Sequence, residues 1–486
     1  MELDPAICYR ALETGDARFD GVFFTGVSTT RIYCRPVCPA RAPARDRCSY
    51  YRHAAAAERA GYRPCLRCRP ELAPGQAPCD GSSRVAAMAA SRINAGALND
   101  EGSIEDLAAG LGLSSRQLRR VVECELGVTP VELAQTRRLL LAKQLLADTT
   151  LPMTEVAFAA GFASIRRFNA LFLERYRMSP TRIRRTSGTG VADDALRLRL
   201  SYRPPLHWPA LLDFLGARAS AGVEAVEGAR YLRTARIGRH AGWLTVSPEP
   251  GKDALRVELS RSLTPVLMPL LARLRELFDL DAQPRVIEGH LAADPLLAPI
   301  VAATPGLRVP GAFDGFELAT RAVLGQQVSV KGATTLSGRF AAAFGEPIET
   351  PFPALTHLTP TPERVSGQPF DEVMAIGLPR ARAATLIALA RAVACDGLTI
   401  APSPEPEAAI RRLTMVPGIG DWTAHYVGMR ALRWPDAFPH GDHGLKHALG
   451  GATPKEILAL GEPWRPWRAY ATFHLWQSLQ AKGQTE

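Results

Sequence analysis

The chain has 486 residues, a formal net charge of +10 and a pI near 9.3. This length predicts several domains, and the basic surplus fits a nucleic-acid partner. No run of about 18 apolar residues occurs, so we expect no membrane partner and a cytoplasmic protein. The nine cysteines include two closely spaced pairs, which indicates a reducing compartment and excludes a disulfide framework.

The two close cysteine pairs are the first feature along the chain. Cys34 and Cys38 form C-x3-C, and Cys65 and Cys68 form C-x2-C after 26 intervening residues. Four thiolates at these spacings predict a tetrahedral zinc site. Arginines surround them, at Arg31, Arg35, Arg41, Arg45, Arg47, Arg63, Arg67 and Arg69. A purely structural zinc ribbon and a zinc centre that faces phosphate both fit this pattern.

Residues 23–38 and 61–70 closely resemble the amino-terminal domain of the Ada proteins of the bacterial adaptive response. The resemblance covers roughly residues 4–75. It implies that Cys34 is both a zinc ligand and the acceptor of a methyl group from DNA methylphosphotriesters. Cys38, Cys65 and Cys68 match the other three ligands. Methylation would cut the charge of the centre from about −2 to about −1, and a less negative site should bind DNA better.

The next segment predicts two helix-turn-helix units. Residues 103–113 and 114–124 form the first pair, residues 153–162 and 163–172 form the second, and an amphipathic stretch at 131–146 joins them. A small helical packing domain is the alternative. The segment resembles the DNA-binding domain of AraC-type regulators, which implies DNA contacts from two helices. The DNA-facing residues we expect are Arg116, Gln117, Arg120, Arg166 and Arg167.

A tight glycine loop marks a second chemistry in the carboxy-terminal half. Residues 417–420 read Pro-Gly-Ile-Gly, and Asp442 follows Gly420 by 22 residues. Gly418 and Gly420 would let backbone N–H groups face a phosphate, although such a loop alone could be an ordinary turn. With residues 200–218, 316–329 and 463–476, the pattern resembles the helix-hairpin-helix DNA glycosylases, and most closely the AlkA type of 3-methyladenine glycosylase.

That resemblance assigns roles to several side chains. Asp442 corresponds to the carboxylate that stabilises the oxocarbenium-like transition state beside the sugar. Aromatic pocket positions for an extruded cationic base correspond to Phe214, Trp422, Tyr426 and Trp476. Members that also nick the strand carry a lysine at the position of Trp422, so tryptophan predicts a monofunctional glycosylase.

The sequence departs from the AlkA pattern in three places. Gln326 matches a DNA-contacting position, but Gln327 follows it where AlkA has a leucine that enters the duplex. Gln477 replaces a tyrosine, and His440-Gly441 precedes Asp442 where AlkA has Pro-Asp. These changes put the lesion range in doubt. The chain also lacks the Pro-Cys-His-Arg motif of O6-alkylguanine methyltransferases, so direct repair of O6-methylguanine is not expected.

The prediction is therefore a multidomain α+β protein for alkylation repair and adaptive-response regulation. The expected domains are a zinc methyl-acceptor domain at 1–80, an all-α helix-turn-helix domain at 81–186, a linker at 187–194, an α/β domain at 195–285 and an all-α glycosylase core at 286–486. Linkers are expected at 75–83 and 186–194.

The expected cofactor is zinc, and the expected partners are double-stranded DNA at the nucleoid and RNA polymerase. One alternative is a non-enzymatic regulator that binds damaged DNA and holds structural zinc. A second alternative is a constitutive glycosylase with structural zinc.

Overall fold

A computed structural model describes residues 3–75, 81–99, 102–186 and 195–483 of the chain. The chain folds into two compact units. Unit 1 comprises Met1–Pro204, Glu249–Ala272 and Leu280–Gln283, and unit 2 comprises Pro205–Pro248, Arg273–Asp279 and Pro284–Glu486. Among the described residues, no helix is both long enough and apolar enough to cross a membrane.

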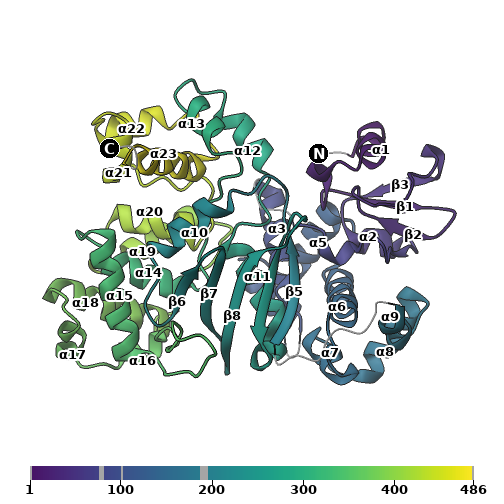
Figure 1. The fold of residues 1–486 in the computed structure, drawn as a ribbon, viewed down its shortest axis with the longest axis horizontal. Coiled ribbons are helices and arrows are strands. Elements are labelled where there is room, and N and C mark those ends of the chain that lie inside the picture. The colour runs from purple at the N-terminus through teal and green to yellow at the C-terminus, as the bar shows by residue number, and fades with distance from the viewer. Residues whose placement is uncertain (1–2, 76–80, 100–101, 187–194, 484–486) are drawn as a thin grey trace. The chain divides into compact units, whose positions relative to one another are not determined.

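The amino-terminal part of unit 1 is a small sheet with the strand order β3-β1-β2-β4 (Figure 1). Its elements are α1 (Pro5–Thr14), β1 (Phe24–Val27), β2 (Ile32–Cys34), β3 (Cys48–Tyr51), α2 (Ala54–Arg59) and β4 (Arg63–Pro64). Strand β4 runs parallel to β2, and the Cys65 N–H donates to the Tyr33 carbonyl at 3.0 Å. This pairing brings the start of the second cysteine pair beside the first.

A helical segment follows in unit 1. Its helices are α3 (Gly81–Asn94), α4 (Ile104–Ala109), α5 (Ser115–Leu126), α6 (Pro130–Asp148), α7 (Met153–Ala159), α8 (Ile165–Tyr176) and α9 (Pro180–Thr186). The two predicted helix-turn-helix pairs are confirmed as α4–α5 and α7–α8. Ser114 and Thr129 each form a capping box, which sets the starts of α5 and α6.

The first predicted linker is shorter than expected, because α3 already begins at Gly81. The rest of that linker, at 76–80, and residues 187–194 lie outside the described residues.

The segment after residue 194 contains the predicted mixture of strands and helices. In unit 1, β5 (Ala195–Ser201) pairs antiparallel with β9 (Ala254–Ser260). In unit 2, β6 (Glu224–Glu227), β7 (Arg230–Ile237) and β8 (His240–Pro248) form an antiparallel meander (Figure 1). Leu196, Leu198 and Leu200 alternate with arginines and are buried, as expected for a strand with one face against a core.

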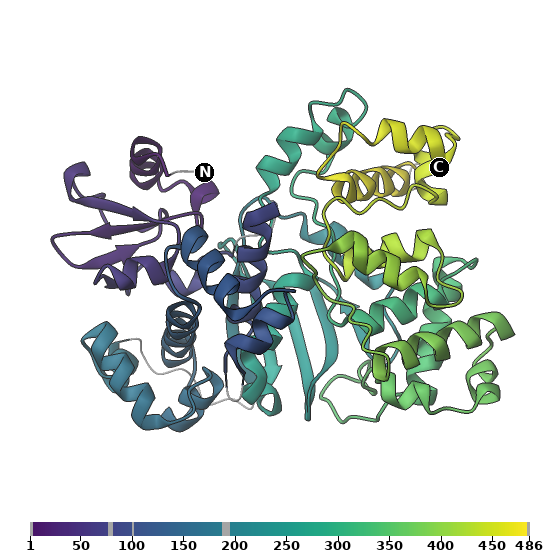
Figure 2. The same cartoon turned by 180° about the vertical axis from the view of Figure 1, so that it is seen from behind.

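The remaining elements are helical. They are α10 (Trp208–Gly216), α11 (Leu267–Leu277), α12 (Pro284–Leu291), α13 (Ala298–Ala303), α14 (Gly315–Leu324), α15 (Val330–Phe344), α16 (Pro362–Ser366), α17 (Phe370–Ala375), α18 (Arg380–Ala394), α19 (Pro406–Thr414), α20 (Asp421–Arg430), α21 (His443–Ala448), α22 (Pro454–Leu460) and α23 (Arg468–Gly483). No strand occurs among the described residues after 286, which confirms the all-helical core (Figure 2). Leu386, Leu413, Val427 and Leu475 are among its fully buried side chains.

Candidate functional site

The carboxylate of Asp442 receives three hydrogen bonds in unit 2. Asp442 is the N-cap of α21, and its Oδ1 accepts the Leu445 N–H at 2.9 Å. The indole Nε1 of Trp476 donates to the same Oδ1 at 2.8 Å, and the indole Nε1 of Trp422 donates to Oδ2 at 2.8 Å. Donors to both oxygens fix the rotation of the carboxylate. Although His440 and Gly441 differ from the Pro-Asp that precedes this residue in AlkA, Asp442 still lies at the start of α21.

The four predicted pocket aromatics are brought together around this carboxylate. The rings of Trp422 and Tyr426, one turn apart on α20, are stacked with centroids 5.4 Å apart. Trp476 on α23 lies 6.4 Å from Tyr426. Phe214 on α10 reaches the group through Phe473, which lies 4.8 Å from Phe214 and 5.3 Å from Trp476. The cluster offers flat apolar faces beside a negative charge, which suits an extruded, positively charged base.

Sequence reasoning missed Phe473 and Gly444. Phe473 is three residues before Trp476, so helical spacing places both rings on one face of α23. Gly444 has a different role, because a Cβ there would lie 2.9 Å from Asp442 Oδ1 and 3.1 Å from the Trp476 ring. The glycine therefore leaves room for the indole to reach the carboxylate.

A cation holds the hydroxyl end of Tyr426. The Arg430 Nη1 donates to the Tyr426 hydroxyl at 2.7 Å, while its other nitrogens donate to the carbonyls of Pro310 and Gly311. Burial raises the pKa of the Tyr426 phenol, but the positive charges of Arg430 and Arg218 outweigh burial and lower that pKa below its ordinary value. The aromatic cluster is thus bordered by positive charge on this side.

The predicted hairpin lies between α19 and α20. Gly418 has φ +87°, and a Cβ there would lie 1.9 Å from the Thr385 hydroxyl oxygen. Gly420 is the N-cap of α20 and has open space around it. The side-chain amide of Gln326 donates to the Gly418 carbonyl at 3.0 Å and to Thr423 Oγ1 at 3.1 Å. Gln326 therefore braces the hairpin, while Gln327 is exposed with φ 53°.

The four predicted zinc ligands also come together, in unit 1. The sulfur atoms of Cys34, Cys38, Cys65 and Cys68 all lie within 4.8 Å of one another. A tetrahedral site with Zn–S bonds of about 2.3 Å needs sulfurs about 3.8 Å apart, so the cluster fits zinc. The Arg35 N–H donates to Cys68 Sγ at 3.3 Å, and the Arg67 N–H donates to Cys65 Sγ at 3.4 Å. Such bonds stabilise thiolates.

Two arginines of the predicted basic shell pair with carboxylates inside the protein. Arg35 is buried and donates through Nε to Asp20 at 2.8 Å. Arg69 binds Glu71 at 2.9 Å and holds Asp148 with two bonds of 2.7 and 2.9 Å. These two guanidinium groups neutralise carboxylates inside the protein. Any contact with DNA phosphates would therefore have to come from the other arginines of the shell.

A buried lysine joins the cysteine cluster to α6. Lys143 forms an ion pair with Glu71, and the two side chains are 3% and 0% exposed. Its ammonium group also donates to the Cys65 carbonyl at 3.3 Å. Arg69 makes a second connection through Asp148 at the end of α6. The cysteine loop and the helix-turn-helix segment are thus joined by charge-assisted bonds, and the Lys143–Glu71 bond among them is shielded from water.

The predicted DNA-facing residues lie at the starts of α5 and α8. Arg116 and Arg120 on α5 and Arg166 and Arg167 on α8 are exposed. Gln117 is also exposed, but its Oε1 accepts from the Ser114 N–H at 2.9 Å in the capping box. Its oxygen is therefore engaged in starting α5, a role that the Ser-x-x-Gln spacing signals.

Family comparisons agree with this order of parts. The sequence matches the metal binding domain of Ada at residues 7–71 and a helix-turn-helix domain at 107–186. It then matches the AlkA N-terminal domain at 197–314 and the HhH-GPD superfamily of base excision DNA repair proteins at 320–453. No match extends over half of the chain, so each describes one part.

Relatives that match almost the whole chain include a mycobacterial protein. The Mycobacterium tuberculosis protein described as "Probable bifunctional transcriptional activator/DNA repair enzyme AlkA" is 39% identical over 482 residues, which covers 97% of this chain and 96% of that protein. The chain belongs to this family of bifunctional transcriptional activator/DNA repair enzymes. Regulator and glycosylase parts therefore occur together in one polypeptide, as the sequence predicted.

Two further relatives match the glycosylase part of this family member. The Escherichia coli DNA-3-methyladenine glycosylase 2 is 38% identical over 277 residues, covering 57% of this chain and 95% of that protein. The structure of 3-methyladenine DNA-glycosylase from Archaeoglobus fulgidus matches with a TM-score of 0.51 at 21% identity, covering 57% of this chain and 97% of that one. This second likeness concerns the fold alone.

We predict that Gly418→Ala destabilises unit 2 by about 1–3 kcal/mol, because alanine is strained at φ +87° and its Cβ meets Thr385. Gly420→Ala is the matched control, since its added Cβ meets no atom within 4 Å. Thermal unfolding of both variants measures the difference. Equal losses of stability would contradict the steric account.

We predict that Lys143→Met destabilises unit 1 by about 3 kcal/mol, because Glu71 stays buried with only Arg69 beside it. Lys143→Met with Glu71→Gln should recover part of the loss, since the double change also removes the uncompensated charge. Chemical denaturation and the rate of zinc release to a chelator test both. The exposed Arg59–Glu132 pair is the control, and Arg59→Met should cost less than about 1 kcal/mol.

Proposed function

We propose that the protein repairs alkylated DNA in two ways and regulates transcription in response to one of them. The carboxy-terminal part excises alkylated bases such as 3-methyladenine as a monofunctional glycosylase. Cys34 takes methyl groups from DNA methylphosphotriesters, and methylation promotes binding to promoters of alkylation-response genes. The observation that carries the proposal is the Asp442 carboxylate, held by two indole N–H groups beside a cluster of aromatic rings.

Base excision follows from the charges around Asp442. The bond between C1′ and the base nitrogen breaks, its electron pair goes to the base, and the sugar becomes an oxocarbenium-like cation. The Asp442 carboxylate stabilises this cation. A water oxygen then bonds to C1′, and its proton passes to Asp442 and from there to solvent. The indoles of Trp422 and Trp476 keep the carboxylate oriented throughout.

The pocket suits N3- and N7-alkylated purines for a chemical reason. These bases carry a positive charge and leave as neutral molecules, so they need little help from a general acid. Their charge is attracted to the faces of Trp422, Tyr426 and Trp476. Because position 422 holds tryptophan, this chain has no lysine there to form a Schiff base, and the product is an abasic site.

Methyl transfer is proposed at the cysteine cluster. Cys34, Cys38, Cys65 and Cys68 would hold zinc, which keeps the sulfurs deprotonated at neutral pH. Cys34 Sγ attacks the methyl carbon of a methylphosphotriester, an S–C bond forms, the C–O bond breaks, and the phosphodiester leaves with its negative charge. The thioether that results is stable, so each protein molecule reacts once.

Regulation follows from the loss of charge on Cys34. The centre becomes less negative by about one charge, which reduces its repulsion of phosphate. The exposed arginines of α5 and α8 would then contact double-stranded DNA at promoters, and RNA polymerase would be the downstream partner. The Lys143–Glu71 pair keeps the cysteine loop and the helix-turn-helix segment in fixed register.

The deciding experiment compares the wild type with Asp442→Asn on duplexes that contain 3-methyladenine. We expect base release by the wild type and a loss of at least about a thousandfold in the variant, with unchanged circular dichroism. Cys34→Ser tests the other activity, and we expect it to abolish methyl transfer from methylphosphotriesters while glycosylase activity persists. Tight binding of damaged DNA with no base release would instead favour the non-enzymatic regulator.

We also predict that Trp476→Phe slows release of 3-methyladenine about tenfold, because the ring stays but one charge-assisted hydrogen bond to Asp442 is lost. Single-turnover kinetics measure the chemical step. Trp243→Phe is the matched control, since this indole packs against Phe352 on another part of unit 2. An unchanged rate in Trp476→Phe would contradict the positioning role.

A further inference from the structure

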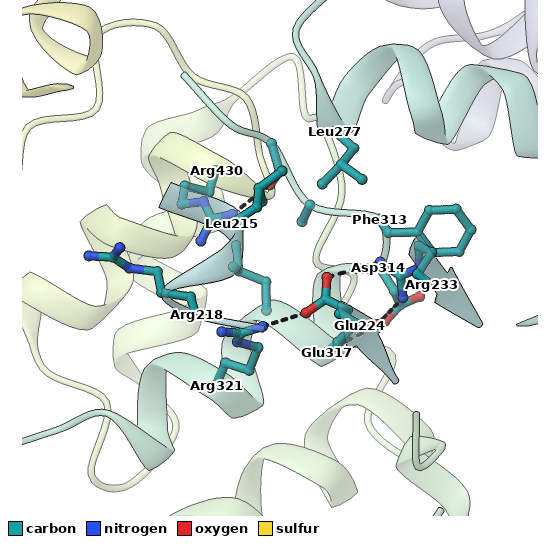
Figure 3. Close-up of a pocket in the computed structure, with 13 residues that line it drawn as sticks. Leu215, Arg218, Glu224, Arg233, Leu277, Phe313, Asp314, Glu317, Arg321 and Arg430 are labelled. Carbon is teal, nitrogen blue, oxygen red and sulfur yellow. Dashed lines mark hydrogen bonds and ion pairs between the residues drawn. The ribbon is translucent and has the colours of Figure 1, made fainter. Parts of the chain in front are cut away.

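A group of four arginines lines a pocket in unit 2 next to the aromatic cluster (Figure 3). Two of them are paired with carboxylates. Arg233 contacts Glu317 at 2.8 Å and Glu224 at 3.6 Å, and Arg321 contacts Glu224 at 2.7 Å. The two positive charges of Arg233 and Arg321 are thus neutralised by the two negative charges of Glu224 and Glu317.

The other two arginines, Arg218 and Arg430, have no carboxylate partner among the described residues within 4.0 Å. Arg430 is held by two backbone carbonyls and by Tyr426. Arg218 donates a long hydrogen bond of 3.4 Å to the Phe214 carbonyl, and its side chain also interacts with the Tyr426 hydroxyl. Figure 3 shows its guanidinium pointing away from the Glu224 carboxylate that Arg321 contacts. No carboxylate among the described residues therefore neutralises its charge.

Arg218 lies against the aromatic cluster. Its guanidinium carbon is 3.8 Å from the centroid of the Phe214 ring, so it covers one face of a pocket aromatic. Arg430 lies 4.9 Å from the same ring and 5.5 Å from Tyr426. Burial lowers the pKa of Arg218, but an arginine pKa starts so high that the group stays charged at neutral pH. A fixed positive charge thus borders the space proposed for the base.

The effect of that charge depends on how charge moves in the reaction. When the C1′–N bond breaks, the electron pair goes to the base, and the base becomes more negative by one unit. A cationic alkylpurine becomes neutral, and an uncharged base such as hypoxanthine becomes an anion that then takes a proton from water. A nearby guanidinium favours either change, since it interacts better with the departing base than with the bound one.

The two classes of lesion need this assistance to different extents. A cationic base is already a good leaving group, so its transition state comes early, when little charge has moved to the base and the guanidinium has a small effect. An uncharged base is a poor leaving group, so stabilising its developing negative charge lowers the limiting barrier.

We infer that Arg218 is a specificity-determining residue of the proposed glycosylase: it promotes release of uncharged damaged bases, which leave as anions, more than release of cationic ones. This inference rests on the proposed function and deepens it by assigning the second class of lesion to a particular side chain. We do not assign this role to Arg430, because its nitrogens already donate hydrogen bonds to the carbonyls of Pro310 and Gly311 and to the Tyr426 hydroxyl.

The test compares Arg218→Gln and Arg218→Lys on two duplexes, one with 3-methyladenine and one with hypoxanthine. In single-turnover assays, we expect Arg218→Gln to slow hypoxanthine release at least about tenfold and to change 3-methyladenine release less than about threefold. Arg218→Lys keeps the charge and should retain most of the hypoxanthine rate. Arg236→Gln, which breaks an ion pair with Glu346 on another part of unit 2, is the control and should change neither rate.

Three results would overturn the inference. They are an equal loss for both lesions, no loss for either, and a hypoxanthine rate as low in Arg218→Lys as in Arg218→Gln. If Arg218→Gln does not fold, Arg218→Ala with added methylguanidinium gives the second measurement, and the additive should raise the hypoxanthine rate selectively. If the wild type releases neither base, the proposed glycosylase function is itself contradicted, and this result is distinct from the three above.

Discussion

The carboxylate of Asp442 depends on two indole hydrogen bonds, and the glycosylase part is arranged around them. Trp422 on α20 and Trp476 on α23 are more than fifty residues apart in the sequence, and each supplies both an aromatic face and a donor to one carboxylate oxygen. The same rings that would hold the base therefore orient the charge that would stabilise the sugar. Gly444 is required by this arrangement, since any Cβ there would press on both the carboxylate and the Trp476 ring.

In unit 1, ion pairs connect the cysteine loop to α6. Its cysteine loops are short and surrounded by arginines, and a cluster of thiolates is difficult to hold without nearby cations. Lys143 reaches from α6 to Glu71 and to the Cys65 carbonyl, and Arg69 reaches back to Asp148. A change at the cysteine cluster would thus act on a loop that is fastened to the helix-turn-helix segment. Buried pairs of this kind specify geometry more than they add stability.

Much of this could be predicted from the sequence because the motifs are local or strongly spaced. The cysteine spacings predicted the four-sulfur cluster, and the helix-turn-helix pattern predicted α4 and α5. The long-range partners could not be predicted. Nothing in the sequence pairs Lys143 with Glu71 or Arg430 with the carbonyls of Pro310 and Gly311, because such contacts depend on how separate elements pack. Gln326 was assigned to DNA, and its amide is found bracing the hairpin, so its DNA contact stays a prediction.

The most direct test of the account asks whether Asp442 stabilises positive charge on the sugar. The measurement is the affinity of the wild type and of Asp442→Asn for two duplexes, one with a cationic pyrrolidine and one with a neutral tetrahydrofuran in place of the damaged nucleoside. The account predicts that the wild type binds the cationic duplex at least about tenfold more tightly and that Asp442→Asn loses this preference while it still binds the neutral duplex. Equal preference in both proteins would contradict the assigned role of the carboxylate.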